Sequence, residues 1–75
     1  MGKQLPVIAE GIVLETLGNG LFKVQLIGGH DVICRPSGKM RMHRINILAG
    51  DSVTIEMSPY DLKRGRIVKR TIKQI

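Results

Sequence analysis

Apolar and polar side chains alternate along two stretches of the chain. The segment FKVQL at residues 22–26 and the segment SVTIEM at residues 52–57 each place an apolar residue at every second position. This period of two is typical of a strand with one face in a core and the other in solvent. We therefore predict one strand in each segment.

Three further segments are predicted to be strands from their composition. Residues 8–15 are rich in β-branched side chains, and Gly11 within them indicates a bulge or a bend. The other two predicted strands are residues 30–35 and residues 66–72. Residues 38–44 do not alternate and contain acceptable helix formers, so they predict about one helical turn.

Breaks in the chain separate these elements at regular intervals. Glycine, asparagine and proline supply the turn conformations at residues 18–20, 28–29, 36–38, 49–51 and 58–61. The resulting order is three strands, a short helix and two strands. This order predicts an all-β fold, a five-stranded antiparallel OB-fold barrel with one short helix between strands three and four, which is an oligonucleotide-binding architecture. A small SH3-like barrel is the alternative.

The length of the chain limits what this fold can contain. The 75 residues predict a single domain, 1–75, with a flexible basic tail at 71–75. A domain this short buries only about 60% of the surface of its unfolded chain, which leaves little space for a catalytic pocket. One cysteine excludes an internal disulfide, and no apolar run is long enough to cross a membrane.

The distribution of charge favours a polyanionic partner. The chain has 12 basic and 6 acidic residues, a net charge of +6 and an isoelectric point near 10.1. Residues 1–34 contain two basic and three acidic residues, whereas residues 35–75 contain ten basic and three acidic residues. A concentrated positive field attracts phosphates and releases their counterions, as in nucleic-acid binding. A solvated basic surface without a partner is the alternative interpretation.

Residues with catalytic or metal-binding chemistry are few and scattered. His30, His43 and Cys34 are the candidates, and their spacing matches no catalytic or metal-binding motif. Cys34 shares strand parity with Val32, which predicts a small core side chain. His30 is expected in a turn or at a strand edge. The sequence thus predicts no enzyme, no cofactor and no metal site.

Two basic clusters are the candidate binding residues. They are Lys39, Arg41 and Arg44 in the helical stretch, and Lys63, Arg64, Arg66, Lys69 and Arg70 in the last loop and strand. Arginine suits RNA because its planar fork binds phosphate through two hydrogen bonds and stacks on bases. Arg66 and Arg70 share strand parity, so we expect them on one face of the barrel.

Aromatic side chains are too few for a base-stacking platform. Single-strand binders of the cold-shock type place several aromatics on one strand face, and this chain has only Phe22 and Tyr60. Phe22 belongs to an apolar stripe, which favours a core position. Recognition is therefore expected through phosphate and sugar contacts to a folded RNA. Met40 and Met42 are either inserted side chains or core residues, and we expect at least one in the core.

Four segments form a collinear set: GIVLETL at 11–17, SGKMR at 37–41, INILAGD at 45–51 and PYDLKRGRIV at 59–68. Together they resemble bacterial-type (bacterial or plastid) translation initiation factor one, without a gap over nearly the whole chain. The resemblance implies a non-catalytic OB barrel that binds the decoding region of the small ribosomal subunit and its rRNA at the aminoacyl site. It also implies cooperation with initiation factors two and three. A general RNA chaperone of the cold-shock type is the alternative function.

The resemblance also implies site residues, a compartment and a monomer. The positions that match the family, together with the two basic clusters, predict RNA contacts at Gly38, Lys39, Arg41, Met42, Arg44, Lys63, Arg64, Arg66 and Arg70. The chain departs from the family at Asn46, where arginine is common, and at Arg44 and Lys69, where an aromatic is common. If residues 44–46 are extended, Arg44 faces the same way as Asn46 and replaces the missing contact. The implied compartment is the bacterial cytoplasm, or the plastid stroma for a plastid gene.

Overall fold

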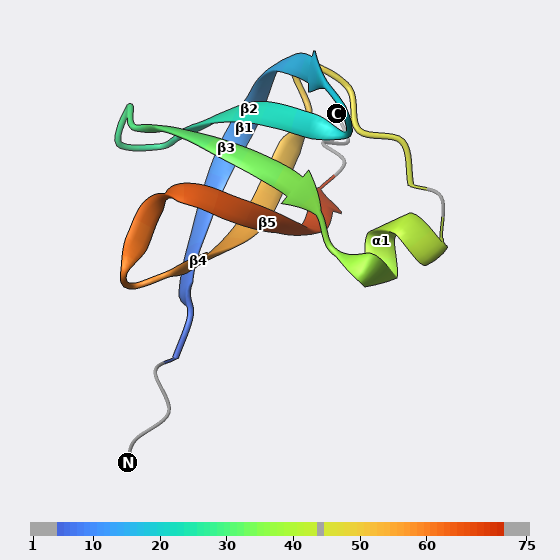
Figure 1. The fold of residues 1–75 in the computed structure, drawn as a ribbon. Helices are drawn as coiled ribbons and strands as arrows, with labels where there is room; N and C mark the ends of the chain where they lie inside the picture. Colours follow the sequence, from blue (N-terminus) through green and yellow to red (C-terminus); the bar gives the residue numbers. More distant parts are fainter. Residues whose placement is uncertain (1–4, 44, 72–75) are drawn as a thin grey trace.

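Five strands close into a barrel, and one short helix lies at one end of it, as the computed structural model in Figure 1 shows. The structure describes residues 5–43 and 45–71. The elements are β1 (Val7–Gly18), β2 (Leu21–Leu26), β3 (Asp31–Pro36), α1 (Gly38–Met42), β4 (Ser52–Ser58) and β5 (Asp61–Thr71). The predicted five-stranded barrel and the position of its helix are confirmed. Of the predicted tail, residue 71 ends β5 and the remainder lies outside the described residues.

The strands follow the order β1-β2-β3-β5-β4 around the barrel. Four of the five neighbouring pairs are antiparallel, but β3 and β5 pair in parallel. The predicted antiparallel OB-fold barrel is thus observed with one parallel pair. The helix, a loop and β4 separate these two strands in the chain, and only such a long connection allows a parallel pairing.

The core is a set of small and medium apolar side chains from every strand, the helix and the loop after it. Its buried members are Val13, Val24, Val32, Cys34, Met40, Ile47, Val53, Ile55, Met57 and Ile67. Phe22 packs against this cluster, which agrees with its predicted place. Met40 is 2% exposed whereas Met42 is 80% exposed, so only the first of the two methionines belongs to the core.

Gly11 is the point of closest approach between β1 and β2. It pairs in regular register with Leu26 and with Val53, and the bulges of β1 lie further along, beyond Val13. Of the predicted bulge or bend at Gly11, the bulge is therefore wrong. A Cβ atom at this position would lie 2.5 Å from the carbonyl oxygen of Gln25, so only glycine fits without displacing backbone.

Candidate functional site

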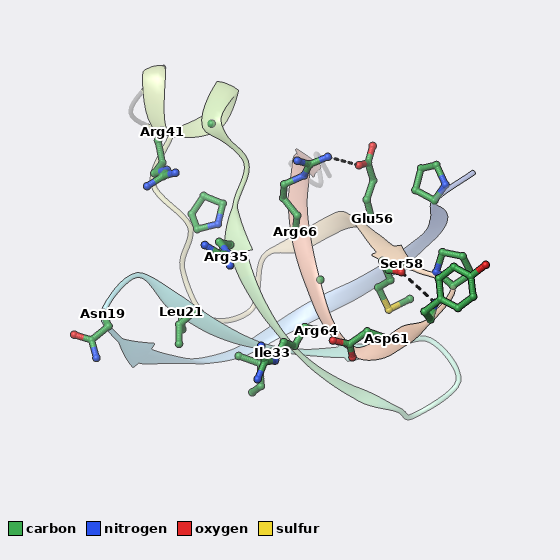
Figure 2. Close-up of a pocket in the computed structure, with 17 residues that line it drawn as sticks. Asn19, Leu21, Ile33, Arg35, Arg41, Glu56, Ser58, Asp61, Arg64 and Arg66 are labelled. Carbon is green, nitrogen blue, oxygen red and sulfur yellow. Dashed lines mark hydrogen bonds and ion pairs between the residues drawn. The ribbon is translucent and has the colours of Figure 1, made fainter. Parts of the chain in front are cut away.

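A broad, open groove of about 1190 Å³ crosses the outer face of β3 and β5 and extends to the helix (Figure 2). The basic residues that line it are Arg35, Arg41, Arg64 and Arg66. Glu56 and Asp61 are its acidic residues, and Tyr60 reaches its rim with 79% of its side chain exposed. The charged side chains of the groove therefore carry a net positive charge, and the groove is too open to enclose a small molecule.

The parallel pairing of β3 and β5 builds the floor of the groove. Ile33 lies beside Arg64 and Arg35 lies beside Arg66 in the register of the two strands. Cys34 on β3 and Ile67 on β5 are buried. Because side chains alternate along a strand, Ile33, Arg35, Arg64 and Arg66 point outward. Arg35 and Arg66 thereby stand side by side on the outer surface of two paired strands.

Gly65 allows this close approach of the two strands. A Cβ atom at Gly65 would lie 3.2 Å from the sulfur of Cys34 and 3.2 Å from Cδ1 of Ile55. Both distances are tighter than ordinary van der Waals contact. A Cβ atom at this position would therefore require its neighbours to shift by a few tenths of an ångström.

Arg66 is held by an ion pair with the neighbouring strand. Its Nη2 atom lies 2.6 Å from Oε1 of Glu56, its register partner on β4 (Figure 2). The two side chains are 58% and 28% exposed, so the pair adds at most about 1 kcal/mol to stability. Its main effect is to orient the guanidinium group of Arg66.

The helix carries its polar residues outward because two residues anchor it. The hydroxyl of Ser37 accepts a hydrogen bond from the backbone N–H of Met40 at 3.3 Å, and Met40 inserts into the core. The backbone N–H of Ser37 donates to the carbonyl of Ile67 at 2.8 Å, which ties the helix to β5. Gly38 and Arg41 consequently line the groove, while Lys39 and Met42 are exposed beside it.

Two more predicted site residues lie apart from the groove lining, as Lys39 and Met42 do. Lys63 is exposed near the start of β5. Arg70 was expected on the face of Arg66, but the register shows Val68 as an extra residue in β5, since Ile67 pairs with Ile55 and Lys69 with Thr54. This bulge inverts the parity beyond it, so the predicted shared face is wrong.

Arg70 has a structural contact at the end of the barrel. It pairs with the buried Val53, and its Nη1 donates a hydrogen bond to the backbone carbonyl of Asn46. The loop that follows the helix is thereby tied to β5. Arg44 lies outside the described residues, so its substitution for the contact at Asn46 stays a prediction.

Arg35 and Tyr60 are two groove residues with side chains suited to RNA that were not among the predicted site residues. The alternation of buried Val32 and Cys34 already indicates that Arg35 points outward. Its position beside Arg66 depends on the parallel pairing of β3 and β5, which no local pattern indicates. Tyr60 lies at the tight turn between β4 and β5, where its exposure follows from its position.

Two of the three candidate catalytic residues, Cys34 and His30, have structural contacts. Cys34 is fully buried, and burial raises the pKa of its thiol to about 11, so it is protonated near neutral pH. Nε2 of His30 lies 2.9 Å from the carbonyl oxygen of Leu62 and donates to it in the Nε2-protonated tautomer. His30 itself lies just before β3, at the strand edge that the sequence predicts.

Neither a cluster of metal ligands nor a membrane-spanning helix is found in the part of the chain that the structure describes. Across residues 5–43 and 45–71, no three histidine, cysteine or acidic side chains gather as metal ligands would. Within the same ranges, no helix has the length and apolar character needed to span a bilayer.

Comparisons with known proteins agree with the observed fold. Residues 6–75 match the family described as Translation initiation factor 1A / IF-1. The solution structure of the translation initiation factor IF-1 from the Wolbachia endosymbiont, strain TRS, of Brugia malayi matches with a TM-score of 0.75. It is 42% identical, and the match covers 89% of this chain and 79% of that one. The crystal structure of YjeQ from Thermotoga maritima matches with a TM-score of 0.74 at 25% identity, over 91% of this chain but only 24% of that one.

Proposed function

The chain belongs to the translation initiation factor 1A / IF-1 family, a family of non-catalytic translation factors, and we propose that it binds the small ribosomal subunit at the aminoacyl site. In this proposal it contacts the rRNA of the decoding region and assists initiation factors two and three. It acts as a monomer where its ribosomes are, in the bacterial cytoplasm or in the plastid stroma.

The observation that carries this proposal is the arginine-lined groove over β3 and β5. Arg64 and Arg66 project from its floor, and the helix adds Arg41 at its edge. Arginine forks bind phosphate oxygens in pairs, so several of them along one open groove suit the backbone of a folded RNA. A folded RNA is recognised mainly through such phosphate and sugar contacts.

We propose distinct roles for the remaining site residues. Gly38 lines the groove without a side chain and lets RNA approach the backbone at the start of the helix. Lys39, Met42 and Lys63 extend the contact on the exposed flanks. Arg70 supports the site through its hydrogen bond to the loop carbonyl of Asn46.

Binding at the aminoacyl site would affect initiation in two ways. A protein of this size seated there would block premature entry of tRNA. It would also adjust the conformation of the subunit so that initiation factors two and three bind. The first effect follows from occupancy, the second requires tighter binding to one conformation of the subunit, and neither requires catalysis by the protein.

Chemical probing of the small-subunit rRNA tests the location of binding. We expect the wild-type protein to protect decoding-region nucleotides and to compete with tRNA for the aminoacyl site. Arg64→Gln should reduce both effects while circular dichroism shows an intact fold. Protection spread over the subunit, or no competition with tRNA, would refute the proposed location.

Binding to unstructured RNA separates the proposal from the cold-shock alternative. Of the aromatic residues that the structure describes, only Tyr60 is exposed, so stacking on a single strand would be weak. We expect much tighter binding to small subunits than to an unstructured oligonucleotide at the same salt. Equal affinities would favour the chaperone.

A further inference from the structure

Arg35 and Arg66 form an unusual pair of neighbours on the groove floor. They occupy the same register position of the parallel strands β3 and β5, and neighbouring strands of a sheet lie about 4.8 Å apart. Both side chains point outward and both line the groove (Figure 2). Like charges on adjacent strands repel each other, so this pair favours an anion between or above the two guanidinium groups.

The two arginines differ in what already holds them. Arg66 donates to Glu56 at 2.6 Å, so its fork is partly occupied by a carboxylate of the protein itself. Among the described residues, the ion pairs are Arg66–Glu56 and Lys23–Asp31, and Arg35 takes part in neither. A phosphate that enters the groove can therefore bind Arg35 without first breaking an internal ion pair.

We propose that Arg35 is an RNA phosphate-binding residue of this groove, and that Glu56 limits RNA affinity by occupying the neighbouring Arg66. The inference rests on the proposed RNA-binding function of the groove. Arg35 supplies a guanidinium fork that no carboxylate competes for in the described residues. Glu56 acts as an internal substitute for a phosphate, and it lowers the net positive charge of the groove.

Lys23 provides a matched control for Arg35. It lies on β2, next to β3, beside the outward-facing Ile33, and its neutralisation removes the same single positive charge. It does not line the groove, and it lies 3.8 Å from Asp31. Arg35→Gln and Lys23→Gln therefore share their change in net charge and differ in their position relative to the groove.

The experiment measures competition of each variant with the wild type for small ribosomal subunits at several salt concentrations. We expect Arg35→Gln to weaken binding about tenfold or more, because a charged hydrogen bond is lost. The slope of log affinity against log salt should fall by about 0.7–0.9 in this variant, the value for one phosphate. Lys23→Gln should weaken binding less than about threefold. Arg35→Lys should keep the slope and lose part of the affinity, because it keeps the charge without the fork.

Glu56→Gln tests the second half of the proposal with the opposite sign. Removal of this carboxylate frees Arg66 and makes the groove more positive, so we expect tighter binding and a steeper salt slope. Weaker binding by a folded Glu56→Gln variant would mean that the ion pair positions Arg66 for RNA, and would overturn the proposed limiting role.

Arg64→Gln distinguishes failure of this inference from failure of the proposed function. If Arg64→Gln weakens binding and Arg35→Gln behaves like Lys23→Gln, the groove binds RNA but Arg35 does not, and the inference is wrong. If Arg64→Gln, Arg35→Gln and Lys23→Gln all bind small subunits with similar affinity, the groove is not the RNA-binding face. The proposed function then loses its main support together with the inference. Circular dichroism of each variant confirms that the barrel is folded.

Discussion

The substitution Gly11→Ala should destabilise the barrel far more than most exchanges of glycine for alanine. The new Cβ would lie 2.5 Å from the carbonyl oxygen of Gln25 and 2.8 Å from Cγ1 of Val24. Ordinary contacts begin near 3.4 Å, so the carbonyl would have to move by roughly 0.9 Å. Because Gly11 also pairs with Val53 on β4, β1 cannot retreat without disturbing a second ladder.

The expected loss of stability is a large part of the total. Overpacking of a core costs about 1–3 kcal/mol and occasionally more. Since the clash at Gly11 involves backbone held on both sides, we expect about 3 kcal/mol or more. A domain of this length has an unfolding free energy of roughly 4–11 kcal/mol. The corresponding fall in Tm is about 12–24 °C.

Urea and thermal unfolding, followed by circular dichroism, measure this loss. Gly28→Ala is the matched control, because its Cβ would meet nothing within 4 Å and Gly28 does not have a positive φ. We expect the control to change stability by less than about 0.5 kcal/mol. A loss below about 1 kcal/mol for Gly11→Ala would show that β1 and β2 separate at little cost, and would refute the argument from close approach.

Four further predictions concern binding and the buried thiol. Affinity for small subunits should fall steeply with salt, by roughly 0.7–0.9 in log–log slope per neutralised phosphate, and a salt-independent affinity would contradict the electrostatic account. Arg41→Glu and Arg66→Glu should weaken binding much more than Lys23→Glu, measured by competition at fixed salt; equal losses would leave only a diffuse basic surface. Cys34→Ser and His30→Ala should leave binding nearly intact. The pKa of the Cys34 thiol is raised from 9.0 to about 11 in the folded protein. The contribution of the neutral thiol to the free energy of unfolding is thus fully present below pH 9 and is lost as pH rises toward 11. Urea unfolding at about pH 8 and about pH 10.5 should therefore show a larger alkaline loss of stability for the wild type than for Cys34→Ser.

The strands that the sequence predicted best are those with one buried face and regular pairing. The alternation at 22–26 and 52–57 matches β2 and β4 to within one residue at each end, and β4 buries every second side chain from Val53 to Met57. Predicted β1 was too short, since its register shifts beyond Val13 interrupt the alternation. The first half of β5 resembled a loop because it contains Gly65 and several charged residues, which the parallel pairing with β3 accommodates.

The candidate site was predictable as a set of residue types but not as a surface. Arg41, Arg64 and Arg66 were selected by charge and by the resemblance, and the fold brings them to one groove. Arg35 was not selected, because its proximity to Arg66 depends on strands that are distant in sequence. Arg70 was placed on the wrong face, since one bulge at Val68 is invisible in the spacing of polar residues.

The parallel closure of the barrel has a consequence for the synthesis of the protein. β1, β2 and β3 are consecutive and can pair as they leave the ribosome, whereas the partners Ile33 and Arg64 are 31 positions apart. Translation at roughly 5–20 residues per second separates them by about 2–6 s. Until β5 has emerged, the nascent chain lacks the groove floor and two of its arginines. Under the proposed function, a half-made chain therefore lacks part of the surface that would contact RNA, and this surface is completed only when β5 pairs with β3.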